Sequence, residues 1–172
     1  MQHADYDRLL HANARLQCQV FAFFKIHTPI DEQSLISLHT TSCHILRLTR
    51  TLDESDEFLP IAPVFFRFGC LMAAYVLLRL LKSPFARYLN ADVKDCFLSS
   101  IDMAKRMSGA SGNTAEKHAT ALTQLWNSTR AFKKTDGSDY TILRTRSRLA
   151  MSVGKSAARV PLEYAWINVR AS

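Results

Sequence analysis

The sequence predicts an all-α protein, a single helical domain of about six helices packed around a central apolar helix at residues 61–81. The composition favours helices, because 48% of the residues are hydrophobic while Gly and Pro number only five each, too few for a turn-rich β fold. At 172 residues the chain is long enough to bury the core of one domain. Residues 61–81 carry apolar side chains on every face of a helical wheel, so other helices must cover them.

A membrane span is the alternative interpretation of residues 61–81, because a span needs about 20 apolar residues. Arg67 and Arg79 leave an uninterrupted apolar core of only residues 68–78, and an Arg in mid-bilayer costs about 3 kcal/mol. We therefore predict a buried helix and no membrane association. Both arginines then need acidic or carbonyl partners, and the acidic residues of 53–57 are the nearest source.

Two amphipathic helices are expected before the central one, at residues 5–27 and 31–52. The first ends before Pro29, and an acidic loop at residues 53–57 connects the second to the central helix, where Pro63 fits the first turn. The positions expected to face the core are Leu9, Leu16, Val20, Phe21, Phe23 and Phe24 in the first helix and Leu35, Leu38, Ile45, Leu46 and Leu52 in the second.

Three further helices are expected after residue 81. A short connection at residues 83–90 leads to a helix at 92–107, whose apolar stripe is Val93, Phe97, Ile101 and Ala104. The Gly-rich linker 108–112 lacks the Gly-Lys-Ser/Thr of a phosphate-binding loop, and Asn113 is expected to cap the next helix. A last helix is expected to start near residue 139.

The four cysteines do not form a recognisable motif. Cys18, Cys43, Cys70 and Cys96 are 25 to 27 residues apart with no C-x-x-C, which predicts reduced core thiols on successive helices rather than a zinc site, a redox motif or a disulfide framework. His39 lies one turn from Cys43, but two ligands without a third do not make a metal site. No catalytic constellation or cofactor motif is present, so we expect a non-enzymatic protein without a cofactor.

The basic character of the chain belongs to its last quarter. Residues 1–127 hold 13 Lys/Arg against 12 Asp/Glu, whereas residues 128–172 hold 9 against 3, a net charge of +6. A weak contact with nucleic acid or an acidic partner would use Lys133, Lys134, Arg144, Arg146 and Arg148, and the alternative is a solvated helix face. Neither reading gives sequence-specific DNA binding.

Three blocks of sequence resemble one protein family. They are residues 58–89 (FLPIAPVFFRFGCLMAAYVLLRLLKSPFARYL), 122–126 (LTQLW) and 143–153 (LRTRSRLAMSV). Their order and spacing resemble the C-terminal helical region of fungal zinc-cluster transcription factors, of the leucine-biosynthesis-regulator type. With the helices between them, the resemblance covers about residues 9–153.

The resemblance implies an all-helical regulatory domain, residues 5–153, from a nuclear regulator of RNA polymerase II transcription. Such a region restrains or exposes an activation segment, through protein partners or a small-molecule effector, and the intact protein is usually a dimer. The six-cysteine zinc cluster that binds DNA in whole members is absent from this chain, so zinc and specific DNA binding do not carry over. The alternatives are an unrelated helical ligand-binding protein or enzyme and a membrane-associated protein.

The family pattern stops after Val153. Gly154 and Pro161 disfavour a continued helix, and the apolar periodicity is lost. Gly154-Lys155-Ser156 can be encoded by a sequence that contains a common intron donor, which suggests translation of a retained intron or a shifted frame. We expect residues 154–172 to be a divergent, poorly ordered tail that adds nothing to the fold.

Overall fold

The computed structural model describes residues 2–21, 32–107 and 114–132, and it confirms the predicted all-α class for that part of the chain. The helices are α1 (Gln2–Gln19), α2 (Glu32–Asp56), α3 (Phe58–Ile61), α4 (Val64–Leu81), α5 (Ala91–Arg106) and α6 (Thr114–Asn127), with a 3-10 helix, η2 (Pro84–Tyr88), between α4 and α5. The helix predicted near residue 139, the tail 154–172, the end of the first predicted helix and the Asn113 cap lie outside the described residues.

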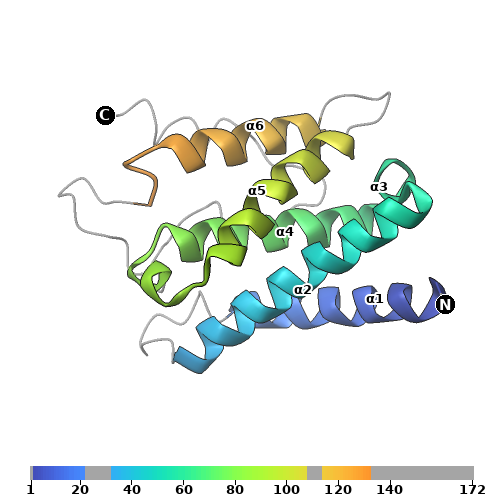
Figure 1. Ribbon diagram of the computed structural model, residues 1–172, viewed down its shortest axis with the longest axis horizontal. Coiled ribbons are helices and arrows are strands. Elements are labelled where there is room, and N and C mark those ends of the chain that lie inside the picture. Colours follow the sequence, from blue (N-terminus) through green and yellow to red (C-terminus); the bar gives the residue numbers. More distant parts are fainter. Residues whose placement is uncertain (1, 22–31, 108–113, 133–172) are drawn as a thin grey trace.

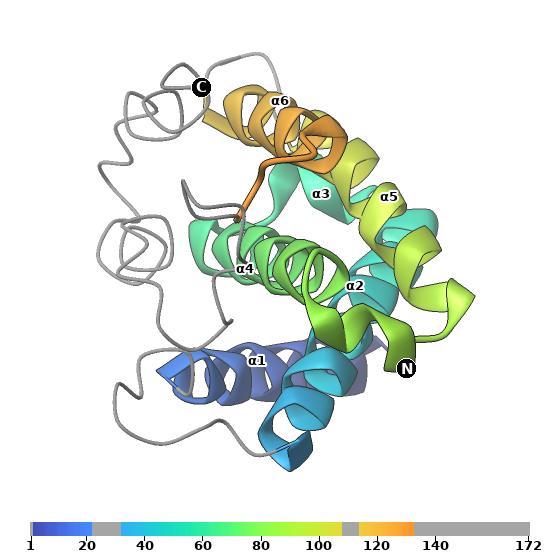
Figure 2. The same cartoon turned by 90° about the vertical axis from the view of Figure 1, so that its left-hand side faces the viewer.

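Helix α4 occupies the middle of the described structure (Figures 1 and 2), where it packs against α1, α2, α5 and α6. The pair α1–α2 lies on one side of it and the pair α5–α6 on the other. Because Leu77, Leu78 and Leu80 are completely buried, the C-terminal half of α4 behaves as the central apolar helix that was predicted.

The N-terminal end of α4 departs from that expectation. Val64 and Phe65 are 67% and 38% exposed, so the first turn of α4 is not wrapped on every face. Pro63 occupies the N-cap position rather than the first turn, because residues 58–61 form the separate helix α3 and the chain must bend before α4 begins. Together with Ile61, which is 75% exposed, these residues form an apolar corner between α3 and α4, which we call the α3–α4 corner.

The predicted acidic loop is mostly helical, and its Asp53 carboxylate pairs with Arg106. Its predicted role as a partner for Arg67 and Arg79 stays a prediction. Helix α2 continues through Asp56, and the bend falls at Glu57, whose φ of 49° is left-handed. The buried Asp53 carboxylate accepts a hydrogen bond from the Leu59 amide (2.9 Å) and forms an ion pair with Arg106. It therefore joins the ends of α2 and α5 to the start of α3.

Arg67 of α4 contacts a carbonyl oxygen, and Arg79 contacts an aromatic ring. Arg67 donates from Nη2 to the Pro60 carbonyl oxygen (2.7 Å), one of the two kinds of partner that were expected. The Arg79 guanidinium lies 5.8 Å from the centre of the Phe132 ring, a cation–π contact. Burial lowers the pKa of Arg79 to about 10, which still leaves it charged at neutral pH.

The helix faces follow the predicted stripes closely. The stripe of α5 is buried, and Phe97 packs on Trp126 of α6 with ring centres 5.1 Å apart. Leu38, Ile45, Leu46 and Leu52 of α2 are buried, as are Leu9 and Leu16 of α1. Phe21 is the exception among the described positions, because it is 68% exposed rather than in the core.

Candidate functional site: a thiol pair between α2 and α5

The described residues bring two cysteines together from helices that are distant in the sequence. Cys43 lies in the middle of α2 and Cys96 in the second turn of α5, so 53 residues separate them. The Cys96 thiol donates a weak hydrogen bond to the Cys43 carbonyl oxygen, with the sulfur 3.9 Å from that oxygen. The two cysteines are therefore neighbours across the α2–α5 contact.

The amphipathic patterns of the two helices explain why these cysteines meet. Cys43 lies next to the buried stripe of α2 that contains Ile45 and Leu46, and Cys96 lies between the buried residues Val93 and Phe97 on α5. When those stripes turn towards the core, the thiols turn with them. The ion pair between Asp53 and Arg106 holds the same two helices together about three turns further along α2.

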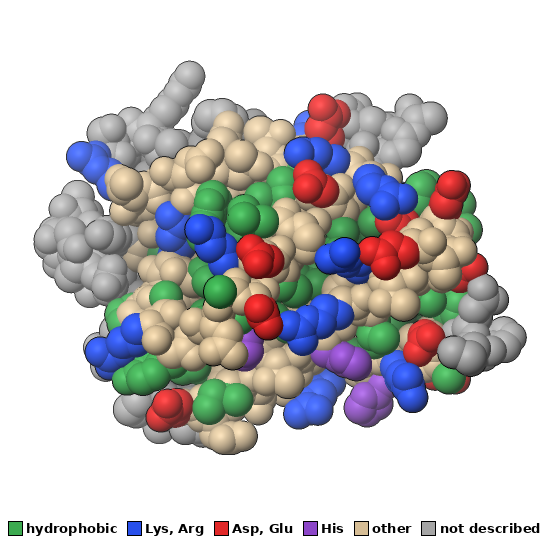
Figure 3. Space-filling model, viewed as in Figure 1, with side chains coloured by type: hydrophobic (Ala, Val, Ile, Leu, Met, Phe, Trp, Pro, Cys, Tyr) green, Lys and Arg blue, Asp and Glu red, His purple; other side chains and the backbone are tan. Residues whose placement is uncertain are grey.

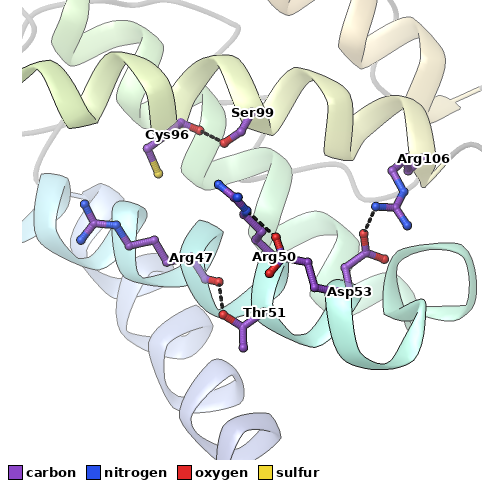
Figure 4. Close-up of polar contacts among 8 residues, drawn as sticks. Arg47, Arg50, Thr51, Asp53, Cys96, Ser99 and Arg106 are labelled. Atoms are coloured by element: carbon purple, nitrogen blue, oxygen red, sulfur yellow. Dashed lines mark hydrogen bonds and ion pairs between the residues drawn. The ribbon is translucent and has the colours of Figure 1, made fainter.

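Two arginines of α2 surround the Cys96 thiol. Figure 4 shows the sulfur pointing from α5 towards α2, with Arg47 and Arg50 extending from α2 towards α5 on either side of it. Arg50 also donates from Nε to Glu54 Oε1 (2.7 Å), which fixes the direction of its side chain. Ser99 donates to the Cys96 carbonyl oxygen (2.9 Å) within α5. The site therefore places positive charge beside a thiol that is itself hydrogen-bonded.

These surroundings affect the two thiols in opposite directions. The neighbouring Cys43 thiol lowers the pKa of Cys96, and the charges of Arg47 and Arg50 lower it further, against the opposing effect of burial. The pKa of Cys43 is raised, first by the neighbouring Cys96 thiol and also by burial. Cys96 is therefore the thiol of the pair that loses its proton more readily.

The remaining cysteines differ from this pair. Cys70 of α4 is buried, and burial followed by the charge of Cys96 raises its pKa to about 12, so it stays a thiol at neutral pH. Cys18 of α1 is exposed, which contradicts the prediction that all four cysteines lie in the core. Their predicted placement on successive long helices is confirmed for α1, α2, α4 and α5, and all four are free thiols.

The site residues predicted from the sequence cannot be placed. Lys133, Lys134, Arg144, Arg146 and Arg148 all lie outside the described residues. On the face shown in Figure 3, cationic and anionic side chains of the described residues are interspersed over α2 and α5 rather than gathered into a basic patch. Among residues 2–21, 32–107 and 114–132 no three His, Cys, Asp or Glu side chains are grouped as metal ligands would be.

Sequence reasoning missed the thiol pair because it searched for cysteines at short spacing. A weak signal was present, since Cys43 and Cys96 each adjoin the apolar stripe of an amphipathic helix. That signal gives the face of each helix but not which helices pack together or in what register. Only the packing of α2 on α5 brings positions 43 and 96 side by side.

Known proteins add no further assignment. No protein-family profile matches the chain, and no curated protein or solved structure matches it. Within the described residues one helix, Val64–Leu81, is long and apolar enough to cross a membrane, and 56% of it is buried inside the fold.

Proposed function

We propose that this chain is a regulatory domain of a nuclear transcription regulator, non-enzymatic in itself, which controls transcription by RNA polymerase II through contacts with other proteins or with a small-molecule effector. The observation that carries the proposal is the ordered resemblance of residues 58–89, 122–126 and 143–153 to the helical region of fungal zinc-cluster factors. The all-α fold around α4 agrees with the architecture that the resemblance implies.

The organisation of the first block supports a regulatory role. Most of the block, residues 58–89, forms α3, α4 and η2 and supplies the buried centre of the described structure. Its N-terminal part also leaves Ile61, Val64 and Phe65 exposed together at the α3–α4 corner. One segment therefore both organises the core and presents apolar surface, which is what a domain needs if protein contacts are to depend on its folded state.

A tethering experiment tests the proposal. The full chain is fused to a heterologous DNA-binding domain in a fungal host, and transcription is measured from a reporter that carries the matching sites. We expect reporter output to differ from that of the DNA-binding domain alone, with a nuclear location for a fluorescent fusion of the chain. The same chain without the DNA-binding domain is the control, and it should not change the reporter because we expect it to make no sequence-specific contact with DNA.

The proposal is contradicted if the tethered chain is folded and nuclear but leaves the reporter at the level of the DNA-binding domain alone under every nutrient condition tried. A chain that fractionates with membranes would instead favour the membrane-associated alternative. Fractionation is therefore measured on the same cells.

A further inference from the structure

The thiol pair between α2 and α5 has the parts of a reversible redox site. The Cys96 sulfur of α5 lies 3.9 Å from the Cys43 carbonyl oxygen of α2, and two guanidinium groups of α2 extend on either side of that sulfur. Cys96 is 8% exposed and Cys70 only 1% exposed, so Cys96 is the more accessible of these two buried cysteines.

We infer that Cys96 is a peroxide-reactive thiol and that Cys43 resolves its oxidised form, so that a peroxide converts the pair into a disulfide between α2 and α5. The geometry supports this assignment because the Cys96 sulfur lies 3.9 Å from the backbone carbonyl oxygen of Cys43, so the two residues already meet across the α2–α5 contact. This inference does not depend on the proposed function. It is tested by chemistry on the purified chain, so a negative result would leave the proposed function standing.

The reaction balances in two steps. The Cys96 thiolate attacks one oxygen of hydrogen peroxide, the O–O bond breaks, and the departing hydroxide takes a proton to become water, which leaves a sulfenic acid on Cys96. The Cys43 sulfur then attacks the Cys96 sulfur, the S–O bond breaks, and the second hydroxide leaves as water with the Cys43 proton. The two sulfurs together lose two electrons and the peroxide gains them, and a dithiol reductant reverses the change.

The positive charges explain why Cys96 would react first. The thiolate is the nucleophilic form of cysteine, and groups that favour it make a particular cysteine reactive. Arg47 and Arg50 favour the thiolate of Cys96, while Cys43 keeps its proton until the sulfenic acid forms beside it. The same guanidinium groups can also stabilise the hydroxide that leaves the peroxide.

The test uses the purified full chain, first reduced and then exposed to hydrogen peroxide before all remaining thiols are alkylated. Peptide mapping without reductant should find Cys43 linked to Cys96 within one chain, the intact mass should fall by two hydrogen atoms, and two of the four thiols should disappear. Oxidation at Cys96 should be at least about tenfold faster than at Cys70.

Matched variants separate the two roles. In C43S the sulfenic acid on Cys96 has no resolving thiol, so dimedone should label Cys96, whereas C96S should leave Cys43 unoxidised. C70S and C18S serve as controls and should both keep the Cys43–Cys96 link. The inference is overturned if wild-type chain, folded by circular dichroism, keeps both thiols while only Cys18 reacts, or if the link formed joins Cys70 instead.

Discussion

Gly69 of α4 lies close against the Asn13 side chain of α1, and this contact gives a prediction at the scale of single residues. A Cβ atom added at Gly69 of α4 would lie 1.9 Å from Oδ1 of Asn13 on α1. We therefore expect G69A to lower the free energy of unfolding by about 2 kcal/mol, because an overpacked core must shift to accommodate the extra atom. Urea denaturation followed by circular dichroism measures this change.

The same contact predicts that G69A changes from destabilising to stabilising when Asn13 is also replaced by Ala. The Asn13 amide is fully buried and neither of its polar side-chain atoms has a hydrogen-bond partner in the part of the chain that the structure describes, so N13A alone should cost little. With the amide gone, Ala at position 69 gains its helix propensity over Gly, about 1 kcal/mol. G69A should thus stabilise N13A, and a destabilising effect of equal size in both backgrounds would refute the contact.

Asp53 gives a second prediction at this scale. D53A leaves the Leu59 amide without its acceptor and Arg106 without its ion-pair partner, so we expect it to cost about 3 kcal/mol in the free energy of unfolding. D53N keeps an oxygen for the Leu59 amide and should cost less. Glu54 is the matched control, because its ion pair with Arg50 is solvent-exposed and E54A should produce no measurable change. Equal losses in D53A and E54A would contradict the account.

At the scale of elements, His118 couples the packing of α6 on α4 to pH. Its Nδ1 atom lies 3.1 Å from the Tyr75 hydroxyl of α4, and burial lowers its pKa below the usual 6.5. The unfolded chain therefore binds the proton more readily than the folded one. The stability from this contact is complete above pH 6.5 and is lost as the pH falls from there through the folded-state pKa of His118.

Melting temperatures measured between pH 7.5 and 5 test this linkage. H118Q can still accept the Tyr75 hydrogen bond but cannot take up a proton, so its melting temperature should fall less on acidification than that of the wild type. His39 contributes to the same pH dependence of stability, because burial and then the charge of Arg47 lower its pKa as well. H39Q should remove that contribution. If the melting temperature of H118Q falls on acidification as much as that of the wild type, protonation of His118 does not destabilise the fold.

The bounds of the helices show how much of the fold can be predicted from the sequence. Periodicity located α5 within one residue at each end, since Val93, Phe97 and Ile101 repeat at helical spacing between polar neighbours. It misplaced the end of α2, because Asp53 looks like part of a solvated acidic loop until Arg106 and the Leu59 amide are seen around it. It also missed α3, because the bend at Glu57 depends on how the chain packs rather than on local propensity.

At the scale of the whole molecule, the separation of charge gives a prediction about nucleic acid. The net +6 of residues 128–172 should supply any DNA affinity, while residues 1–127 are nearly neutral. We therefore expect weak binding without sequence preference that is lost as salt rises, because it rests on phosphate contacts alone. Fluorescence anisotropy across a salt series measures it, and discrimination between one site and random DNA at physiological salt would contradict the prediction.

Function could be approached from the sequence only through resemblance, whereas the thiol pair required the packing. The three blocks suggest a regulatory domain before any coordinates are known, but nothing in the spacing of Cys43 and Cys96 reveals that they meet. The α3–α4 corner is a similar case, because a fully apolar stretch does not reveal which of its faces stays exposed. The packing of specific helices decides which cysteines meet and which apolar residues stay exposed.

The central claim, that the folded helical domain acts on transcription, is tested most directly by combining the tethered reporter with the Gly69 variants. Output is measured for the tethered wild type, G69A and the N13A/G69A double variant at matched protein levels. At a growth temperature at which G69A is unfolded and the wild type is folded, we expect the reporter effect of the wild type to be lost in G69A and to return in N13A/G69A. An effect that persists unchanged when G69A unfolds the domain, or no effect from the folded wild type, would contradict it.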